Sequence, residues 1–323
     1  MHDKQIPRST MGLVLCLLGS AGCATFAIAA APSKHAAKDT SDAAASAERA
    51  FWATFHGGHY EDIGGALEQL EAVYLAHPND PTTAAHIGFL HAWRASERGR
   101  LPHPRASITD DVSLARRYFA EAVALAPDDA RFRGFLASMT LAEGNIHGDA
   151  KLVRRGFFDL GDAVDAWPEF NLFTRGYVLS QLPFDDPAYA TAVDDQWKDL
   201  DACFGTHLDR SNPNLEPFLA DETHEGPKRA CWNSWIAPHN FEGFFLNMGD
   251  MVVKAGDPQT ARKLYAQAKL AKGYDAWPYK DVLERRLAHA DENVALFRAK
   301  PPTEGDSGPM IATPFACMGC HQK

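Results

Sequence analysis

Two cysteines and a histidine close to the C-terminus are the residues of this 323-residue chain best suited to do chemistry. They form the box Cys317-x-x-Cys320-His321, which is followed by two further residues. A Cys-x-x-Cys pair suits a redox disulfide or half of a zinc site. The tail offers no second pair of ligands, as a structural zinc site needs, and no strand–helix–strand context, as a thioredoxin-like disulfide needs.

The box resembles the haem-attachment site of the c-type cytochrome family. In that family the two thiols form thioether bonds to the haem vinyl groups, and the adjacent histidine ligates the iron. Two residues between the thiols let both sulfurs reach one edge of the porphyrin. The resemblance implies one covalent haem c on Cys317 and Cys320, with His321 as the proximal iron ligand.

A second axial ligand must come from upstream, because no suitable residue follows His321. The first candidate is His239. It lies in an aromatic-rich segment that also contains Trp232, Trp235, Phe241 and Phe244. Such a segment offers a ring-lined slot and an imidazole, but the same residues also suit an ordinary core and a helix N-terminus. Met310 is the second candidate. An iron face without a second protein ligand is the third alternative.

The N-terminus is typical of an export signal, with a basic start, an apolar run at 12–18 and small residues after it. The run is too short to span a bilayer. A small-x-small motif at 27–29 predicts cleavage of a signal peptide, assigned to residues 1–31. A Ser-Ala-Gly-Cys motif ending at Cys23 instead resembles a bacterial lipobox and implies a lipid anchor there. Both alternatives predict a periplasmic protein, either soluble or membrane-anchored.

The remaining cysteines form a natural pair. Of six cysteines, Cys16 and Cys23 lie in the signal and two belong to the C-terminal box. Cys203 and Cys231 remain, and oxidising compartments preserve disulfides. A bond between them would close a loop of 27 intervening residues and stabilise the fold by about 3 kcal/mol. Two buried free thiols are the alternative.

Composition and patterning predict an all-α protein with an acidic surface. The net charge of −10 argues against partners such as nucleic acid or an anionic membrane surface. Residues 32–47 are small and polar and predict a linker. From residue 48 onward, apolar residues recur with helical spacing, and no run alternates as a strand would.

One spacing pattern recurs along the chain. Offsets of 4, 3 and 5 residues occur in Ala66-Leu70-Val73-Pro78, Ala115-Phe119-Ala122-Pro127 and Gly156-Leu160-Ala163-Pro168, and the first three positions return in Ala261-Tyr265-Ala268. This pattern, with Gly249 and Gly88 ahead of two copies, resembles the tetratricopeptide repeat (TPR) family. The resemblance implies a solenoid of helical hairpins over residues 48–298, with a surface that binds a protein partner.

The chain departs from that family in several places. The successive repeat prolines are 49 and 41 residues apart, more than the 34-residue repeat, which predicts insertions at Gly99–Asp110 and Gly144–Lys151. Loop signals interrupt the pattern between residues 199 and 245. A last helix at Tyr279–Phe297 is expected to cap the array, and residues 299–323 form an extended tail with the haem box.

Four other histidines receive no functional role from the sequence. His56 and His59 flank a Gly-Gly pair that indicates a turn after a helix. His86 and His91 lie five residues apart in a predicted helix, and this spacing does not place them on one face. We therefore expect both to be ordinary helix residues.

Three functions follow from these observations. The leading hypothesis is an exported monohaem c-type protein that transfers one electron and docks its partner through the TPR-like body. A second is a haem enzyme or gas sensor with an open distal iron face. A third is a periplasmic binding scaffold whose terminal cysteines form a disulfide or bind a metal. No motif for hydrolysis or phosphate binding settles whether the protein is an enzyme.

Overall fold

The computed structural model describes residues 34–96, 103 and 105–299. From residue 36 onward these residues belong to one compact unit. Several predictions concern residues outside the described ranges, namely the signal peptide, the lipobox at Cys23, Met310 and the Cys317-x-x-Cys320-His321 box.

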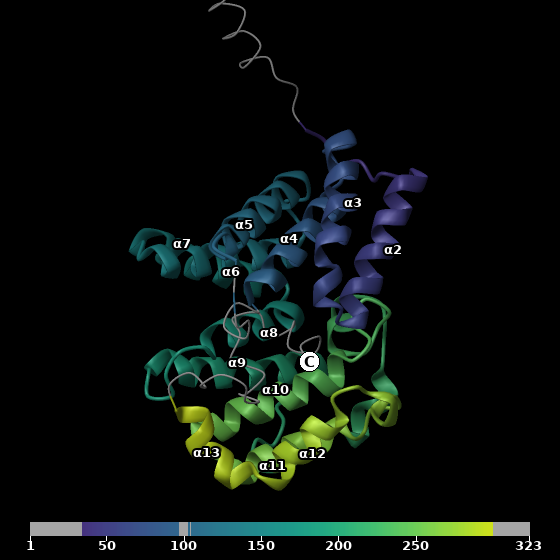
Figure 1. Cartoon of the computed structure of the whole chain (residues 1–323). Coiled ribbons are helices and arrows are strands. Elements are labelled where there is room, and N and C mark those ends of the chain that lie inside the picture. Colours follow the sequence, from purple (N-terminus) through teal and green to yellow (C-terminus); the bar gives the residue numbers. More distant parts are fainter. Residues whose placement is uncertain (1–33, 97–102, 104, 300–323) are drawn as a thin grey trace, which may run out of the picture. The chain divides into compact units, whose positions relative to one another are not determined.

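The described residues form helices and contain no strand, which confirms the all-α prediction for this part of the chain (Figure 1). The α-helices are α2 (Asp42–Gly57), α3 (Ile63–Ala76), α4 (Pro81–Ser96), α5 (Ile108–Leu125), α6 (Ala130–His147), α7 (Ala150–Ala166), α8 (Pro168–Leu179), α9 (Pro187–Phe204), α10 (Asn240–Ala255), α11 (Pro258–Ala268), α12 (Lys280–Ala288) and α13 (Ala290–Arg298). Short 3₁₀ turns are η1 (Tyr60–Asp62), η3 (Glu216–Asp221), η4 (Pro227–Cys231) and η5 (Tyr274–Ala276). In these ranges no helix has both the length and the apolar character needed to cross a bilayer.

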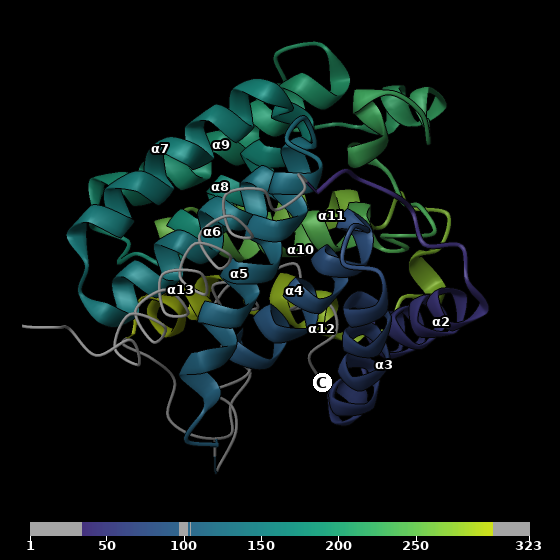
Figure 2. The same cartoon turned by 90° about the horizontal axis from the view of Figure 1, so that it is seen from above.

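Helices that follow each other in sequence pack in pairs. The pairs are α2 with α3, α4 with α5, α6 with α7, α8 with α9 and α10 with α11. Contacts between α3 and α4, α5 and α6, and α7 and α8 join one pair to the next, and α10 also packs against α13. Figures 1 and 2 show this succession of pairs in two views.

Glycines allow the two helices of a pair to approach closely. A Cβ atom on Gly249 of α10 would lie 2.1 Å from the Tyr265 ring of α11, and one on Gly88 of α4 would lie 3.1 Å from the Phe119 ring of α5. Tyr265 and Phe119 are fully buried. A glycine in the first helix thus makes room for the ring in the second.

The first helix begins earlier than predicted. We expected a linker up to residue 47, but α2 begins at Asp42, where the Ser41 side chain accepts a hydrogen bond from the backbone N–H of Ala44. Ala44 and Ala47 are buried. The segment is polar overall, but the alanines that follow Ser41 have high helix propensity, and Ser41 is a favourable N-cap residue. Together they start the helix earlier than the composition indicated.

The insertion predicted at Gly144–Lys151 is wrong. Helix α6 continues through Gly144 to His147, and a two-residue turn of Gly148, with a φ of +65°, and Asp149 leads into α7. The extra length lies in the helices themselves, which contain 18 and 17 residues. The single last helix predicted at Tyr279–Phe297 is likewise two helices, α12 and α13.

The long connection between α9 and α10 is tied to the helices at both ends. The structure joins Cys203, near the end of α9, to Cys231 of η4 by a disulfide with the Cα atoms 5.8 Å apart. Near the other end, Asn233 Oδ1 accepts from the Phe241 backbone N–H at 2.8 Å, and Asn240 Nδ2 donates to the Ala230 carbonyl at 2.6 Å. These contacts fix the segment that precedes α10.

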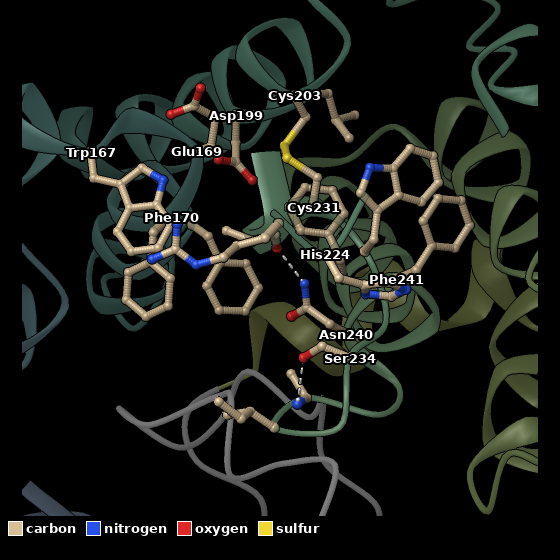
Figure 3. A pocket seen from close by; sticks show the side chains of 18 of the residues that line it. Trp167, Glu169, Phe170, Asp199, Cys203, His224, Cys231, Ser234, Asn240 and Phe241 are labelled. Atoms are coloured by element: carbon tan, nitrogen blue, oxygen red, sulfur yellow. Dashed lines mark hydrogen bonds between the residues drawn. A yellow bond between two sulfur atoms is a disulfide. The ribbon is translucent and has the colours of Figure 1, made fainter. Parts of the chain in front are cut away.

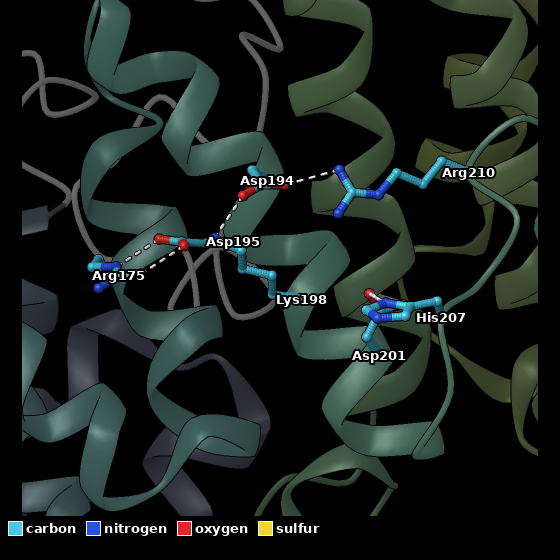
Figure 4. A network of polar contacts seen from close by, with 7 residues as sticks. All are labelled: Arg175, Asp194, Asp195, Lys198, Asp201, His207 and Arg210. Carbon is cyan, nitrogen blue, oxygen red and sulfur yellow. Dashed lines mark hydrogen bonds and ion pairs between the residues drawn. The ribbon is translucent and has the colours of Figure 1, made fainter.

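Ion pairs hold α9 against its neighbours (Figure 4). Arg175 of α8 donates twice to the buried Asp195 carboxylate, at 2.7 Å each. Asp194, one position earlier, pairs with Lys198 and with Arg210 of the following connection. The bidentate geometry and the burial of Asp195 make the Arg175 pair the one that orients α8.

The glycine contacts predict a clear difference between two substitutions. Gly249→Ala should lower the free energy of unfolding by about 1–3 kcal/mol, because its methyl group overlaps the buried Tyr265 ring. The control Gly161→Ala, where a Cβ meets nothing within 4 Å, should raise it by about 0.5–1 kcal/mol. Urea denaturation measures both, and equal stability of the two variants would contradict the packing described.

Candidate functional site

A cavity of about 500 Å³ lies between α2, α4, α6, α8 and α10. Its wall thus comes from the first helix of each pair, together with segment 235–239 and the two residues 278–279. The wall is mostly aromatic and includes Trp52, Phe55, Phe89, Phe135, Phe173 and Phe244. The volume falls within the range of about 300–1,000 Å³ that is typical of small-molecule and cofactor sites.

One side of the cavity is closed by a contact between α2 and the segment before α10. The Trp52 and Trp235 rings meet edge to face with their centroids 4.9 Å apart. The His56 Nε2–H donates to the Ile236 carbonyl oxygen over 3.2 Å. The Trp235 and Ile236 side chains remain 65% and 53% exposed, so the rim of the cavity presents apolar surface to solvent.

His86 of α4 also lines the cavity, although the sequence suggested no role for it. Its ring stacks on Phe51 of α2 with the centroids 3.9 Å apart and the planes 8° from parallel. Burial lowers the pKa of His86 to about 3, so its imidazole is neutral at physiological pH. The pairing of His86 with Phe51 depends on packing between helices from two different pairs, which residue spacing does not reveal.

His239 lies on the cavity wall immediately before α10, close to the rings with which the sequence grouped it. Its Nδ1 lies 3.6 Å from Oε1 of Glu242, and neither atom has a hydrogen-bond partner among the described residues. Glu242 is fully buried and its Oε2 accepts from Asn233 Nδ2 at 2.7 Å. At 3.6 Å this is an ion-pair contact rather than a hydrogen bond. It places the Glu242 carboxyl group behind Nδ1, as carboxylates lie behind many histidines that ligate a metal through Nε2.

A second cavity of about 370 Å³ adjoins the first and shares Arg131, Phe170 and Phe244 with it. The Cys203–Cys231 disulfide and the carboxyl groups of Glu169 and Asp199 line it (Figure 3). Asp199 is buried, and its Oδ1 has no hydrogen-bond partner among the residues that the structure describes. Burial, followed by the charges of Glu169 and Asp195, raises the pKa of Asp199 well above its usual range. Asp199 is therefore a buried acid that favours its neutral form.

Trp232 belongs to the core rather than to the main cavity wall. It is buried and stacks on Phe241 with the centroids 5.6 Å apart. The aromatic segment singled out by the sequence thus divides in two. Trp232 and Phe241 pack into the body, whereas Trp235, His239 and Phe244 line the large cavity.

The large cavity fits a planar haem group in its chemistry. Within the described ranges, no three histidine, cysteine or carboxylate side chains converge on a position that would hold a metal ion. A haem iron needs only one protein ligand on each face, and the unpartnered imidazole of His239 suits that role. The aromatic wall would cover the apolar faces of the porphyrin, and Arg131 supplies a cation beside the wall.

Comparisons with protein-family models, with curated proteins and with solved structures find no match to this chain. The functional argument therefore rests on the chain's own residues. Of the predicted site residues, Cys203, Cys231 and His239 lie beside the two adjoining cavities. Met310 and the Cys317-x-x-Cys320-His321 box lie outside the described residues.

His86 predicts a loss of stability in acid. The unfolded imidazole takes up a proton near pH 6.5, whereas the folded one resists protonation down to about pH 3. The unfolded state therefore binds more protons in this window, and stability falls as the pH drops through it. His86→Phe should make the decline shallower by up to about 1 kcal/mol per pH unit. The control His147→Gln, at an exposed position, should not. Urea denaturation between pH 7 and pH 4 measures the slopes, and parallel curves for wild type and His86→Phe would contradict the assignment.

Asp199 predicts the opposite dependence. Its folded carboxyl keeps a proton that the unfolded one loses above about pH 4, so this residue makes the fold less stable as the pH rises. Asp199→Asn should therefore stabilise the protein more at pH 8 than at pH 4.5. Thermal unfolding at both pH values measures this difference, with the exposed Asp185→Asn as control. A stability change that is the same at both pH values would show that Asp199 ionises normally.

Proposed function

We propose that this protein is an exported c-type haem protein that transfers single electrons. The observation that carries the proposal is the aromatic cavity with an unpartnered imidazole at His239, in a chain that also bears the Cys317-x-x-Cys320-His321 box. A haem left in water would expose apolar surface at about 25 cal/mol per Å². The aromatic wall of the cavity offers apolar surroundings that would keep that surface out of water.

A c-type haem supplies a one-electron redox centre when bound. In the proposal, Cys317 and Cys320 hold it covalently and His321 ligates the iron. The rings of the cavity exclude water, and the neutral His86 adds no positive charge beside the metal. The exposed apolar rim formed by Trp235 and Ile236 suits brief docking of a redox partner.

The proposal includes a TPR-like architecture for the body. Its support is the helix pairing together with the glycine-to-ring contacts of Gly88 with Phe119 and of Gly249 with Tyr265. In such arrays the first helices form a continuous binding face, which is where the cavity lies. The Cys203–Cys231 disulfide is in keeping with a periplasmic location, because disulfides persist in oxidising compartments.

A binding scaffold without haem is the second candidate function. It is favoured by the exposed Trp235 and Ile236 at the rim of a groove formed by first helices. In that case the groove holds an apolar peptide of a partner, and Cys317 and Cys320 pair with each other or bind a metal. A haem enzyme or gas sensor shares the haem with the main proposal and differs in an open distal iron face.

Covalent haem attachment is the direct test of the main proposal. Full-length protein made together with a c-type maturation system should retain haem after denaturing electrophoresis, and the Cys317→Ala/Cys320→Ala double variant should lose it. The Cys203→Ala/Cys231→Ala double variant is the matched control. It removes two other thiols and should keep the haem band. Wild-type protein without covalent haem would exclude both haem functions and leave the scaffold.

A further inference from the structure

The described chain ends beside the C-terminus of α10. Arg298, the last residue of α13, donates from Nε to the Lys254 carbonyl at 2.8 Å and from Nη2 to the Ala255 carbonyl at 2.6 Å. Phe297 before it is buried in the core. The last described residues of the chain are therefore fixed beside the C-terminal end of α10.

The cavity is within reach of that place. His239 immediately precedes α10, and the helix contains 16 residues, which corresponds to a length of about 24 Å. From Ala299 to Cys317 the chain advances 18 residues and spans up to about 60 Å when extended. The C-terminal segment is thus long enough to bring its cysteines from one end of α10 to the other, with chain to spare for a curved path.

Of the imidazoles on the cavity wall, His239 is the one whose surroundings suit an iron ligand. His56 uses its Nε2 to hold the Ile236 carbonyl. His86 lies flat against Phe51 with one face of its ring covered. The His239 Nδ1 has no hydrogen-bond partner in the described part of the chain, and it lies 3.6 Å from the fully buried carboxyl group of Glu242. A carboxylate behind a ligating imidazole fixes its tautomer and makes the other nitrogen a better donor.

Resting on the proposed haem attachment at Cys317 and Cys320, we infer that the cavity receives this chain's own C-terminal segment, residues 300–323. His239 Nε2 would then be the second protein ligand of the iron, in addition to His321. Glu242 acts as a positioning residue for His239.

The absorption spectrum of the haem-loaded full-length chain tests this inference. The oxidised wild type should be low-spin, because two imidazoles complete the coordination of the iron. His239→Ala should convert it to a high-spin form, and added imidazole should restore the low-spin spectrum. Unchanged circular dichroism will show that the variant is folded. His239→Met should remain low-spin with a raised reduction potential, since a thioether stabilises ferrous iron.

Two further variants complete the test, a control from the cavity wall and a variant of the positioning residue. His86→Phe removes another imidazole of the wall and should leave the iron low-spin. Glu242→Gln should also stay low-spin but shift the reduction potential upward, because His239 loses the anion behind Nδ1 and becomes a weaker donor.

The outcomes separate the inference from the proposed function. Wild-type protein without covalent haem contradicts the function. Covalent haem whose spectrum is unaffected by His239→Ala, or is altered by His86→Phe instead, contradicts only the inference. A low-spin spectrum that develops only at high protein concentration would assign the ligand to a second copy of the chain, and this also overturns it.

Discussion

The candidate site depends on one long-range contact, between α2 and the segment before α10. Trp52 and Trp235 pack edge to face, and the His56 imidazole holds the Ile236 carbonyl, although the latter two residues are 180 positions apart. Aromatic–aromatic contacts of this kind are worth about 0.5–1.5 kcal/mol beyond the area they bury. This contact closes one side of the space between the first helices of the pairs. The aromatic residues there therefore line a cavity with a rim rather than an open groove.

The segment that makes this contact is itself held from both ends. The Cys203–Cys231 disulfide ties it to α9, and hydrogen bonds of Asn233 and Asn240 tie it to the start of α10. The same anchoring places His239 in front of Glu242. An imidazole that is to ligate a metal needs neighbours that hold its ring in place, because a ring that rotates freely binds the metal less tightly.

Local sequence features predicted the helices, but long-range packing decided the candidate site. Gly88 and Gly249, which the spacing pattern singled out, each approach a ring within one helix pair. His239 was grouped with Trp235 and Phe244 because all three are close in sequence. The contribution of α2 and the stacking of His86 on Phe51 were not predictable. Those contacts join different hairpins, and their register follows from how the pairs pack rather than from spacing.

We propose that the helical body encloses a haem carried by the C-terminal segment and that two histidines ligate its iron. The low-temperature electron paramagnetic resonance spectrum of the ferric, haem-loaded, full-length protein in dilute solution tests this most directly. Two imidazole ligands should give a rhombic low-spin signal, and the His239→Ala variant should lose that signal. A high-spin axial signal from the wild-type protein would contradict it, because the iron would then lack its second protein ligand.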